Sequence, residues 1–216
     1  MRSRIVVPAA LALLTLLACA TTAEELAPVP LPAPQLSGGK PLMEALALRT
    51  TSRAFASEPL PAQVLSNLLW AAWGINRPKE GKRTAPSARN WQEIDVLVVN
   101  ASGAYLYDAP RNLLKPLVAG DHRALTGTQG FVKDAPVTLV LVADATRMGG
   151  ASGADAQGYA WADAAFISEN VYLFCASEGL ATGVRASVDR PALAKALRLA
   201  PTQTIVLAQS VGYPKK

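Results

Sequence analysis

The sequence has few of the side chains that build metal centres and nucleophilic sites. Its 216 residues include one histidine, His122, and two cysteines, Cys19 and Cys175. Because metal and nucleophilic sites need several converging groups, the sequence predicts no metal site, and we expect His122 to lie on the surface. No residue stands out as a catalytic acid, base or nucleophile, so the catalytic residues stay unassigned.

Charged residues are also sparse, and they are scattered rather than clustered. They make up 17% of the chain, with a formal net charge of +5. No basic run is long enough to follow a phosphate backbone, which argues against nucleic-acid binding. The chain also lacks a Gly-x-Gly-x-x-Gly turn after a strand-like segment, which argues against a Rossmann dinucleotide site. Half of the residues are hydrophobic, and the length fits one globular domain.

A long apolar run at the N-terminus has the layout of an export signal. Two arginines precede the apolar residues 5–18, and small residues follow them. The run is too short to span a membrane, so the pattern predicts a signal peptide at 1–23 and a periplasmic or secreted protein beginning at Glu24. An alternative is open, because Leu16–Cys19 is an imperfect lipobox. In that case the protein would be a lipoprotein anchored to the membrane through Cys19.

Cleavage before Glu24 would leave Cys175 as the only cysteine, which excludes an intramolecular disulfide. Cys175 lies in an apolar helical run, so we expect an unreactive buried thiol.

The rest of the chain predicts an α+β fold, with a mainly antiparallel sheet flanked by helices. Residues 24–40 are rich in proline and predict an extended linker, which places the domain at 41–216. Hydrophobic periodicity predicts helices at 42–48, 61–73 and 155–178, a short helix capped by Asp189, and strands at 94–99, 104–107, 137–143 and 203–211. We further expect a basic loop at 75–89 and short helical segments at 111–119 and 121–125.

The segment Arg49–Phe55 reads Arg-Thr-Thr-Ser-Arg-Ala-Phe and directly follows the first predicted helix. Arginine binds phosphate oxygens with two parallel hydrogen bonds, and neighbouring hydroxyls add neutral donors. Composition alone is equally compatible with a frayed helix end that carries solvated charges. The pattern Arg-x-(Ser/Thr)-x-Arg-x-Phe resembles the flavin-phosphate motif of the nitroreductase family.

Further motifs of that family follow in the same order along 41–216. Pro86–Gln92 resembles its Pro-Ser-(Ser/Ala)-x-Asn-x-Gln segment, and Asp163–Asn170 with Gly179–Gly183 resembles its central helix and the exit from it. Gly103–Asp108 is similar to a hairpin of the thiazole/oxazole-type oxidase branch. The final Gly212–Lys215 is similar to a Gly-Tyr-Pro segment that precedes a basic residue.

The resemblance implies an intertwined homodimer with two FMN sites at its interface, each built by both subunits. It assigns the phosphate to Arg49, Thr50, Thr51 and Arg53, and the flavin ring to Asn90. The strand-like stretch from Thr182 would follow the ring edge, with a backbone N–H near Arg185 or Ala186 facing the flavin nitrogen N5. Lys215 would also reach the phosphate, unless it belongs to a floppy basic terminus.

Together with the predicted export signal, the resemblance implies an exported FMN-dependent oxidoreductase. Its two half-reactions would alternate on small planar substrates such as quinones or nitroaromatics, with the flavin carrying the redox step. The alternative is a non-catalytic flavin-binding or carrier protein of the same fold, because Thr50 replaces a common basic residue and the chain stops at Lys216. Reduced nicotinamides are not expected outside the cytoplasm, so the electron donor would be a redox partner protein or the substrate itself. The basic loop Arg77–Arg83 could steer an acidic partner.

Overall fold

The computed structural model describes residues 26–215, so the expected leader and Cys19 lie outside the described residues. The helices are α1 (Leu42–Leu48), α2 (Ala62–Trp73), α3 (Gly153–Glu178) and α4 (Arg190–Ala196). Short 3-10 turns are η1 (Ala88–Asn90), η2 (Arg123–Thr126), η3 (Gly130–Lys133) and η4 (Ala145–Arg147). The strands are β1 (Val29–Pro30), β2 (Ile75–Arg77), β3 (Lys82–Arg83), β4 (Ile94–Val99), β5 (Gly103–Asp108), β6 (Leu113–Ala119), β7 (Val137–Asp144), β8 (Ala181–Arg185) and β9 (Gln203–Gly212).

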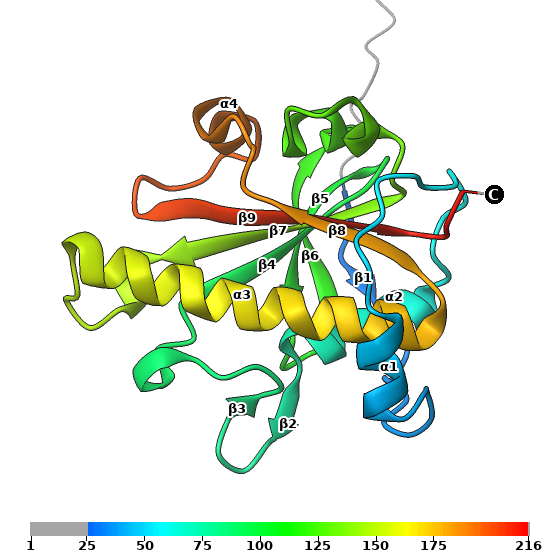
Figure 1. Ribbon diagram of the computed structural model, residues 1–216. Helices are drawn as coiled ribbons and strands as arrows, with labels where there is room; N and C mark the ends of the chain where they lie inside the picture. Colours follow the sequence, from blue (N-terminus) through cyan, green and yellow to red (C-terminus); the bar gives the residue numbers. More distant parts are fainter. Residues whose placement is uncertain (1–25, 216) are drawn as a thin grey trace, which may run out of the picture.

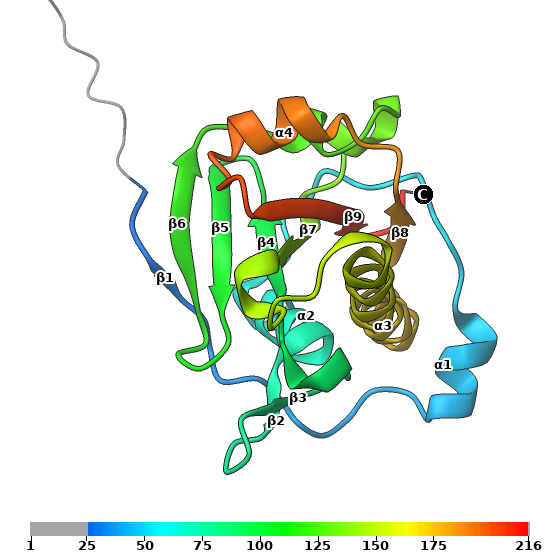
Figure 2. The same cartoon turned by 90° about the vertical axis from the view of Figure 1, so that its left-hand side faces the viewer.

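Seven strands form one antiparallel sheet in the order β1-β6-β5-β4-β7-β9-β8, and β2 with β3 forms a separate hairpin. Helices flank this sheet, with α2 and α3 on one face and α4 on the other (Figures 1 and 2). The predicted α+β fold with a mainly antiparallel sheet is therefore confirmed.

The central strands β4 and β7 are apolar over most of their length because both of their faces are covered. Along β4, Val96 and Val98 belong to the core shared with α2 and α3, whereas Leu97 and Val99 belong to the core under α4. Side chains of a strand alternate between its faces, so a sheet buried on both sides needs a continuous apolar run rather than an alternating one. This explains why β4 and β7 were predicted from their apolar runs.

The longest helix, α3, crosses one face of the sheet (Figure 1). The candidate site lies beside this helix. It begins at Gly153, two residues before the predicted start. It ends at Gly179, which has a φ of 71° and so adopts the left-handed conformation that glycine accepts readily at the end of a helix. The chain then turns back at once into the edge strand β8.

Two predictions of local structure were wrong. Residues 111–119 were expected to be helical, but most of them form β6 between β1 and β5. Its Pro116 lies opposite Tyr105, where the register of β5 and β6 shifts. A bulge next to a short edge strand tolerates the missing N–H of proline, whereas a helix interior does not. The expected loop at 75–89 contains the β2–β3 hairpin.

The proline-rich segment lies along the domain. Val29 and Pro30 pair with β6. Farther on, the carbonyl of Ala33 accepts a hydrogen bond from Gln63 Nε2 of α2 at 2.9 Å. These contacts give hydrogen-bond partners to backbone groups of the segment, which has few N–H groups because of its prolines.

Among residues 26–215, no helix combines the length and the apolar character that crossing a membrane would require.

Candidate functional site

Three segments that are far apart in the sequence converge beside the C-terminal half of α3. The backbone N–H of Ser52 donates to the Thr182 carbonyl of β8 at 2.8 Å. The N–H of Ala56 donates to the Tyr213 carbonyl at 2.9 Å, and the N–H of Lys215 donates to the Ala54 carbonyl at 3.3 Å. Backbone bonds therefore fix the Arg49–Phe55 motif against both β8 and the chain terminus.

Tyr172 of α3 ties this assembly to the core. Its hydroxyl lies 2.9 Å from Thr51 Oγ1 and accepts a hydrogen bond from the Val184 N–H at 3.1 Å. Its ring carries the guanidinium of Arg49, whose central carbon is 5.4 Å from the ring centroid. The side chain is 7% exposed, so it forms a rigid floor under the motif. Such a contact orients the cation without removing it from solvent.

Gly183 allows the close approach of the motif to β8. A Cβ atom at this position would lie 2.7 Å from the Ser52 carbonyl oxygen, which is closer than carbon and oxygen can pack. The glycine that was expected only to end a turn therefore has a second role, which is to seat the motif on the strand.

The assembled surface is rich in cationic and hydroxyl donors. Arg49, Thr50, Thr51, Arg53 and Lys215 are all exposed. Within residues 26–215, no carboxylate forms an ion pair with any of these cations. Their donors are therefore available to an anionic ligand, and the donor set fits a phosphate.

Two of the predicted site residues direct their side chains inward instead. Thr182 is 2% exposed, and its hydroxyl donates to the Ser210 carbonyl at 2.9 Å. Arg185 is buried, and its guanidinium donates to the carbonyl and hydroxyl of Thr126 and to the hydroxyl of Ser210. Burial lowers the pKa of Arg185 to about 10. Any contact of these residues with a ligand would therefore come from their backbone, which is the kind of contact that the resemblance implied for Arg185 or Ala186. Ala186 follows β8 and is exposed.

The structure does not bring Asn90 to the same place. The N–H of Ala88, in the same turn as Asn90, donates to Asp163 Oδ2 at 2.8 Å. Asp163 and Tyr172 are nine residues apart in α3, which is about two and a half turns, so their side chains lie on opposite sides of the helix. Figure 2 shows the same separation, with α1 on one side of α3 and the β2–β3 hairpin on the other. Within one protomer, α3 lies between Asn90 and Arg49.

The turn that carries Asn90 is strained and closed by hydrogen bonds. Arg89, Asn90 and Gln92 have positive φ angles of 51°, 56° and 50°. Non-glycine residues rarely adopt this conformation unless their surroundings impose it. Here the Ser87 hydroxyl accepts from the Gln92 N–H at 2.8 Å and donates to Glu93 Oε2 at 3.3 Å. The exposed side chain of Asn90 lines a pocket of about 260 Å³ together with Arg83.

Beneath this turn lie two buried carboxyl groups. Glu93 is 0% exposed and Asp163 is 2% exposed, and the two carboxyl groups are neighbours. Burial, together with the neighbouring Asp163, raises the pKa of Glu93 to about 7. Burial and a neighbouring acid both disfavour the charged carboxylate, so Glu93 keeps its proton to a higher pH than an exposed glutamate does.

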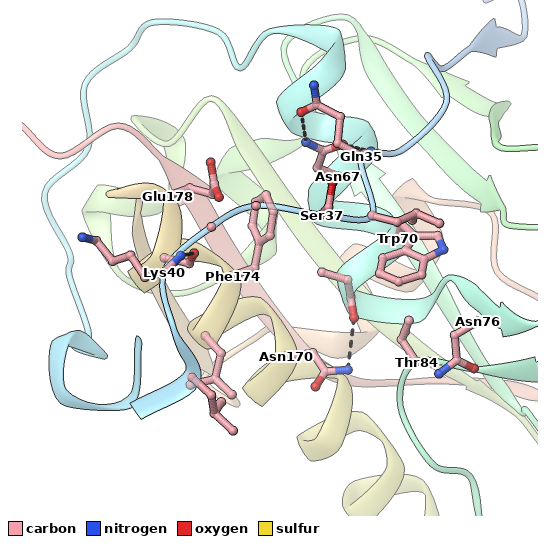
Figure 3. Close-up of a pocket in the computed structure, with 17 residues that line it drawn as sticks. Gln35, Ser37, Lys40, Asn67, Trp70, Asn76, Thr84, Asn170, Phe174 and Glu178 are labelled. Carbon is pink, nitrogen blue, oxygen red and sulfur yellow. Dashed lines mark hydrogen bonds between the residues drawn. The ribbon is translucent and has the colours of Figure 1, made fainter. Parts of the chain in front are cut away.

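One cleft is separate from both places. It has a volume of about 700 Å³ and lies between the proline-rich segment, α2 and α3. Figure 3 shows Trp70 and Phe174 on its walls and the amide of Asn170 bonded to a backbone carbonyl. None of the predicted site residues lines it.

The two residues singled out for their rarity lie in ordinary surroundings. Cys175 is buried without a disulfide, and burial raises the pKa of its thiol above the usual range, which agrees with the expected unreactive thiol. The imidazole Nε2 of His122 lies 3.0 Å from the Ala119 carbonyl. Among residues 26–215 no group of three histidine, cysteine or acidic side chains could hold a metal ion.

Three important residues were missed at the level of the sequence. Tyr172 belongs to an apolar helical run. Its hydrogen bond with Thr51 joins residues that are 121 positions apart, so no local sequence pattern predicts it. Glu93 resembles an ordinary polar residue before a strand, and Asp163 resembles a polar position on a helix. The available signal was the isolated acid within a largely apolar stretch of α3.

Comparisons with known proteins agree with this architecture. The sequence model of the nitroreductase family matches residues 46–213. Among solved structures, a protein assigned as a nitroreductase from Ralstonia eutropha JMP134 is 40% identical, with 88% of this chain and 90% of that chain covered and a TM-score of 0.84. A comparison with curated proteins found no match.

Two more distant structures share the fold. An NADPH:FMN oxidoreductase from Vibrio harveyi, in complex with NAD+, is 17% identical over 81% of this chain and 69% of that chain, with a TM-score of 0.62. A protein from Desulfovibrio desulfuricans, assigned as a nitroreductase and in complex with FMN, is 20% identical over 83% of this chain and 89% of that chain, with a TM-score of 0.60. With the family match covering most of the described residues, the chain belongs to the nitroreductase family.

Proposed function

We propose that the protein is an FMN-dependent oxidoreductase whose cofactor phosphate binds where the Arg49–Phe55 motif, β8 and Lys215 meet. The observation that carries this proposal is the convergence of these segments around Tyr172 with their cations unpaired. Family relatives support the choice of ligand, since one was solved with FMN and another is an NADPH:FMN oxidoreductase.

The side chains have distinct tasks in this proposal. Arg49 and Arg53 donate to phosphate oxygens, and Arg49 is oriented for this by the ring of Tyr172. The hydroxyls of Thr50 and Thr51 and the ammonium group of Lys215 complete the donor set. When bound, the flavin supplies the redox chemistry, and the protein binds and orients it.

We further propose that the working form is a homodimer in which each flavin site takes residues from both subunits. One argument is the placement of Asn90 and Arg49 on opposite sides of α3, which prevents one flavin from touching both within a protomer. The other is α1, where Leu42, Met43, Leu46 and Leu48 are exposed and only Ala45 is buried. An exposed apolar helix face of this kind marks an interaction surface.

The oligomeric state has a direct test. Sedimentation equilibrium at micromolar concentration should give a dimer with two flavins. A monomer that still carries a tightly bound flavin would contradict the shared site, although it would leave the phosphate site standing.

The substrates proposed are small planar electron acceptors such as quinones and nitroaromatics. The alternative, a non-catalytic flavin carrier, differs in one measurable respect. Purified protein should be yellow and release FMN in both cases, but only an enzyme should turn over quinones or nitroaromatics with an artificial electron donor. Stoichiometric FMN without turnover would favour the carrier, and a colourless protein that does not take up added FMN would refute both.

The place of action and the electron donor follow from the predicted export signal. For an exported protein, whether periplasmic or anchored through Cys19, we propose that electrons come from a redox partner protein or from the substrate itself. Localisation of the mature protein should be combined with stopped-flow reduction of the flavin. A cytoplasmic protein that NADPH reduces rapidly would overturn this part of the proposal.

A further inference from the structure

The turn 87–92 is held from below by two acidic side chains. Asp163 accepts a hydrogen bond from the Ala88 N–H, and Glu93 accepts one from the Ser87 hydroxyl. The same hydroxyl accepts from the Gln92 N–H, so the bonds close a loop with Asn90 at its apex. Arg89 and Asn90 are themselves exposed, so the buried acids hold the strained turn through the residues beside them.

The two acids face each other without a compensating cation. Glu93 Oε1 is buried and receives no hydrogen bond from the described residues. Within residues 26–215, neither acid forms an ion pair with lysine or arginine. Two neighbouring carboxylates that are buried away from water repel each other strongly once both are ionised.

The cations around the pair are engaged elsewhere. Arg147 of η4 donates to the backbone carbonyl of Glu93 at 2.7 Å and forms an ion pair with Asp95 at 2.8 Å. Arg83 of β3 donates to the Gln92 amide at 2.8 Å and to the Trp73 carbonyl at 3.0 Å. Asp144, at the end of β7, contributes its backbone N–H to the Glu93 carbonyl, and its carboxylate caps η4. Asp163 is the charged group of α3 that lies next to Glu93.

We propose that Glu93 and Asp163 are positioning residues that share one proton and thereby hold Asn90 in place for the flavin ring. When the shared proton leaves to solvent, the pair carries two negative charges and the side chains move apart. Ala88 and Ser87 then lose their anchors, and the strained turn relaxes. The role assigned to Asn90 rests on the proposed function, but the proton-dependent anchoring of the turn does not.

The pair predicts a pH dependence of definite sign. In the anchored turn Glu93 keeps its proton up to a pKa of about 7, whereas in an open, solvated turn it would return to its usual value of 4.5. The anchored state therefore binds the proton more tightly, and raising the pH favours opening. Linkage between these two pKa values gives an increase of about tenfold in opening between pH 6 and pH 9.

Hydrogen exchange measured by mass spectrometry on the purified protein tests this directly. The exchange of the peptide 86–92, divided by its intrinsic rate at each pH, should rise about tenfold in the wild type between pH 6 and pH 9. Glu93→Gln replaces the acid by an amide that cannot lose this proton, so the turn should stay protected and show no pH dependence. Asp163→Asn removes the neighbouring negative charge but leaves Glu93 buried, so its pH dependence should be weaker than that of the wild type. Asp189→Asn is the matched control, because the Asp189 carboxylate accepts a hydrogen bond from a backbone N–H at α4. This variant should follow the wild type.

A flat wild-type profile, or a slope that persists in Glu93→Gln, would overturn the proposal. If one variant fails to fold, the wild-type profile and the other variant decide. The flavin content of the same samples is read separately, so an absent flavin would refute the proposed function without touching the exchange result.

Discussion

Helix α3 meets two charged regions that differ in nearly every respect. On the side of Tyr172 the charges of Arg49 and Arg53 are positive and exposed, whereas on the side of Asp163 the acidic groups are buried. Among residues 26–215, neither set forms an ion pair with groups of opposite charge. An exposed unpaired arginine costs little because water solvates it, and it remains available to a ligand. A buried unpaired carboxyl avoids a much larger cost only by keeping a proton. The first region is thus suited to binding, and the second to responding to pH.

The positive side also contains a buried cation, and its removal should have the largest effect on stability. Arg185→Ala leaves a cavity and takes the donors away from Thr126 and Ser210, so we expect a loss of about 2–4 kcal/mol in the free energy of unfolding. Urea denaturation measures this loss, with the exposed Arg198→Ala as a control that should stay within about 0.5 kcal/mol of the wild type. An equally small change in Arg185→Ala would show that its hydrogen bonds to Thr126 and Ser210 are unimportant.

The negative side should make stability depend on pH. Because the folded state raises the pKa of Glu93 from 4.5 to about 7, the folded protein binds this proton more tightly than the unfolded chain. The contribution of this group therefore falls as the pH rises from about 4.5 to about 7 and is constant above that, with a total of at most about 3 kcal/mol. Glu93→Gln should remove this slope in urea denaturation at pH 5 and pH 8. Parallel curves for the two proteins would contradict the buried acid pair.

The smallest effect is expected at Asn90, which contacts the solvent rather than the core. Asn90→Ala removes one neutral hydrogen-bonding group from the ring, so FMN affinity should fall by less than about tenfold, corresponding to about 0.5–1.5 kcal/mol. The reduction potential of the bound flavin should shift, since hydrogen bonds to the ring tune its electronics. Potentiometric titration measures that shift. An unchanged potential and turnover would show that Asn90 is an ordinary turn residue.

Sequence patterns predicted the parts of this molecule that depend on neighbouring residues. The helix at 42–48 and the strand at 94–99 have the bounds that hydrophobic periodicity gave them. The helical cap at Asp189 is also present, with its carboxylate accepting from the Ala192 N–H. Family membership was predicted from ordered motifs and is confirmed by the match over 46–213.

Contacts between distant residues could not be read in the same way. The segment 111–119 was predicted to be helical, but pairing with β5 and β1 makes most of it the strand β6. The partnership of Glu93 and Asp163 joins the start of a strand to a distant helix, and neither residue carries a local signal of it. The sequence therefore predicted which segment carries the arginines, but not the tyrosine that orients them.

The central claim is that the Arg49–Phe55 motif recognises the phosphate of FMN, and riboflavin, which lacks that phosphate, tests it most directly. Dissociation constants for both flavins should be measured with flavin-stripped wild type, Arg49→Ala and Arg53→Ala. Arg111→Ala serves as the control, since its side chain is 70% exposed and lies in the distant β5–β6 hairpin.

We expect each motif variant to weaken FMN binding by roughly 10- to 100-fold, or about 1.5–3 kcal/mol, because each loses a charge-assisted contact. Riboflavin binding should stay unchanged in all the proteins, and Arg111→Ala should match the wild type for both flavins. Equal affinity of the wild type for FMN and riboflavin, or an equal loss of both in the arginine variants, would contradict the account.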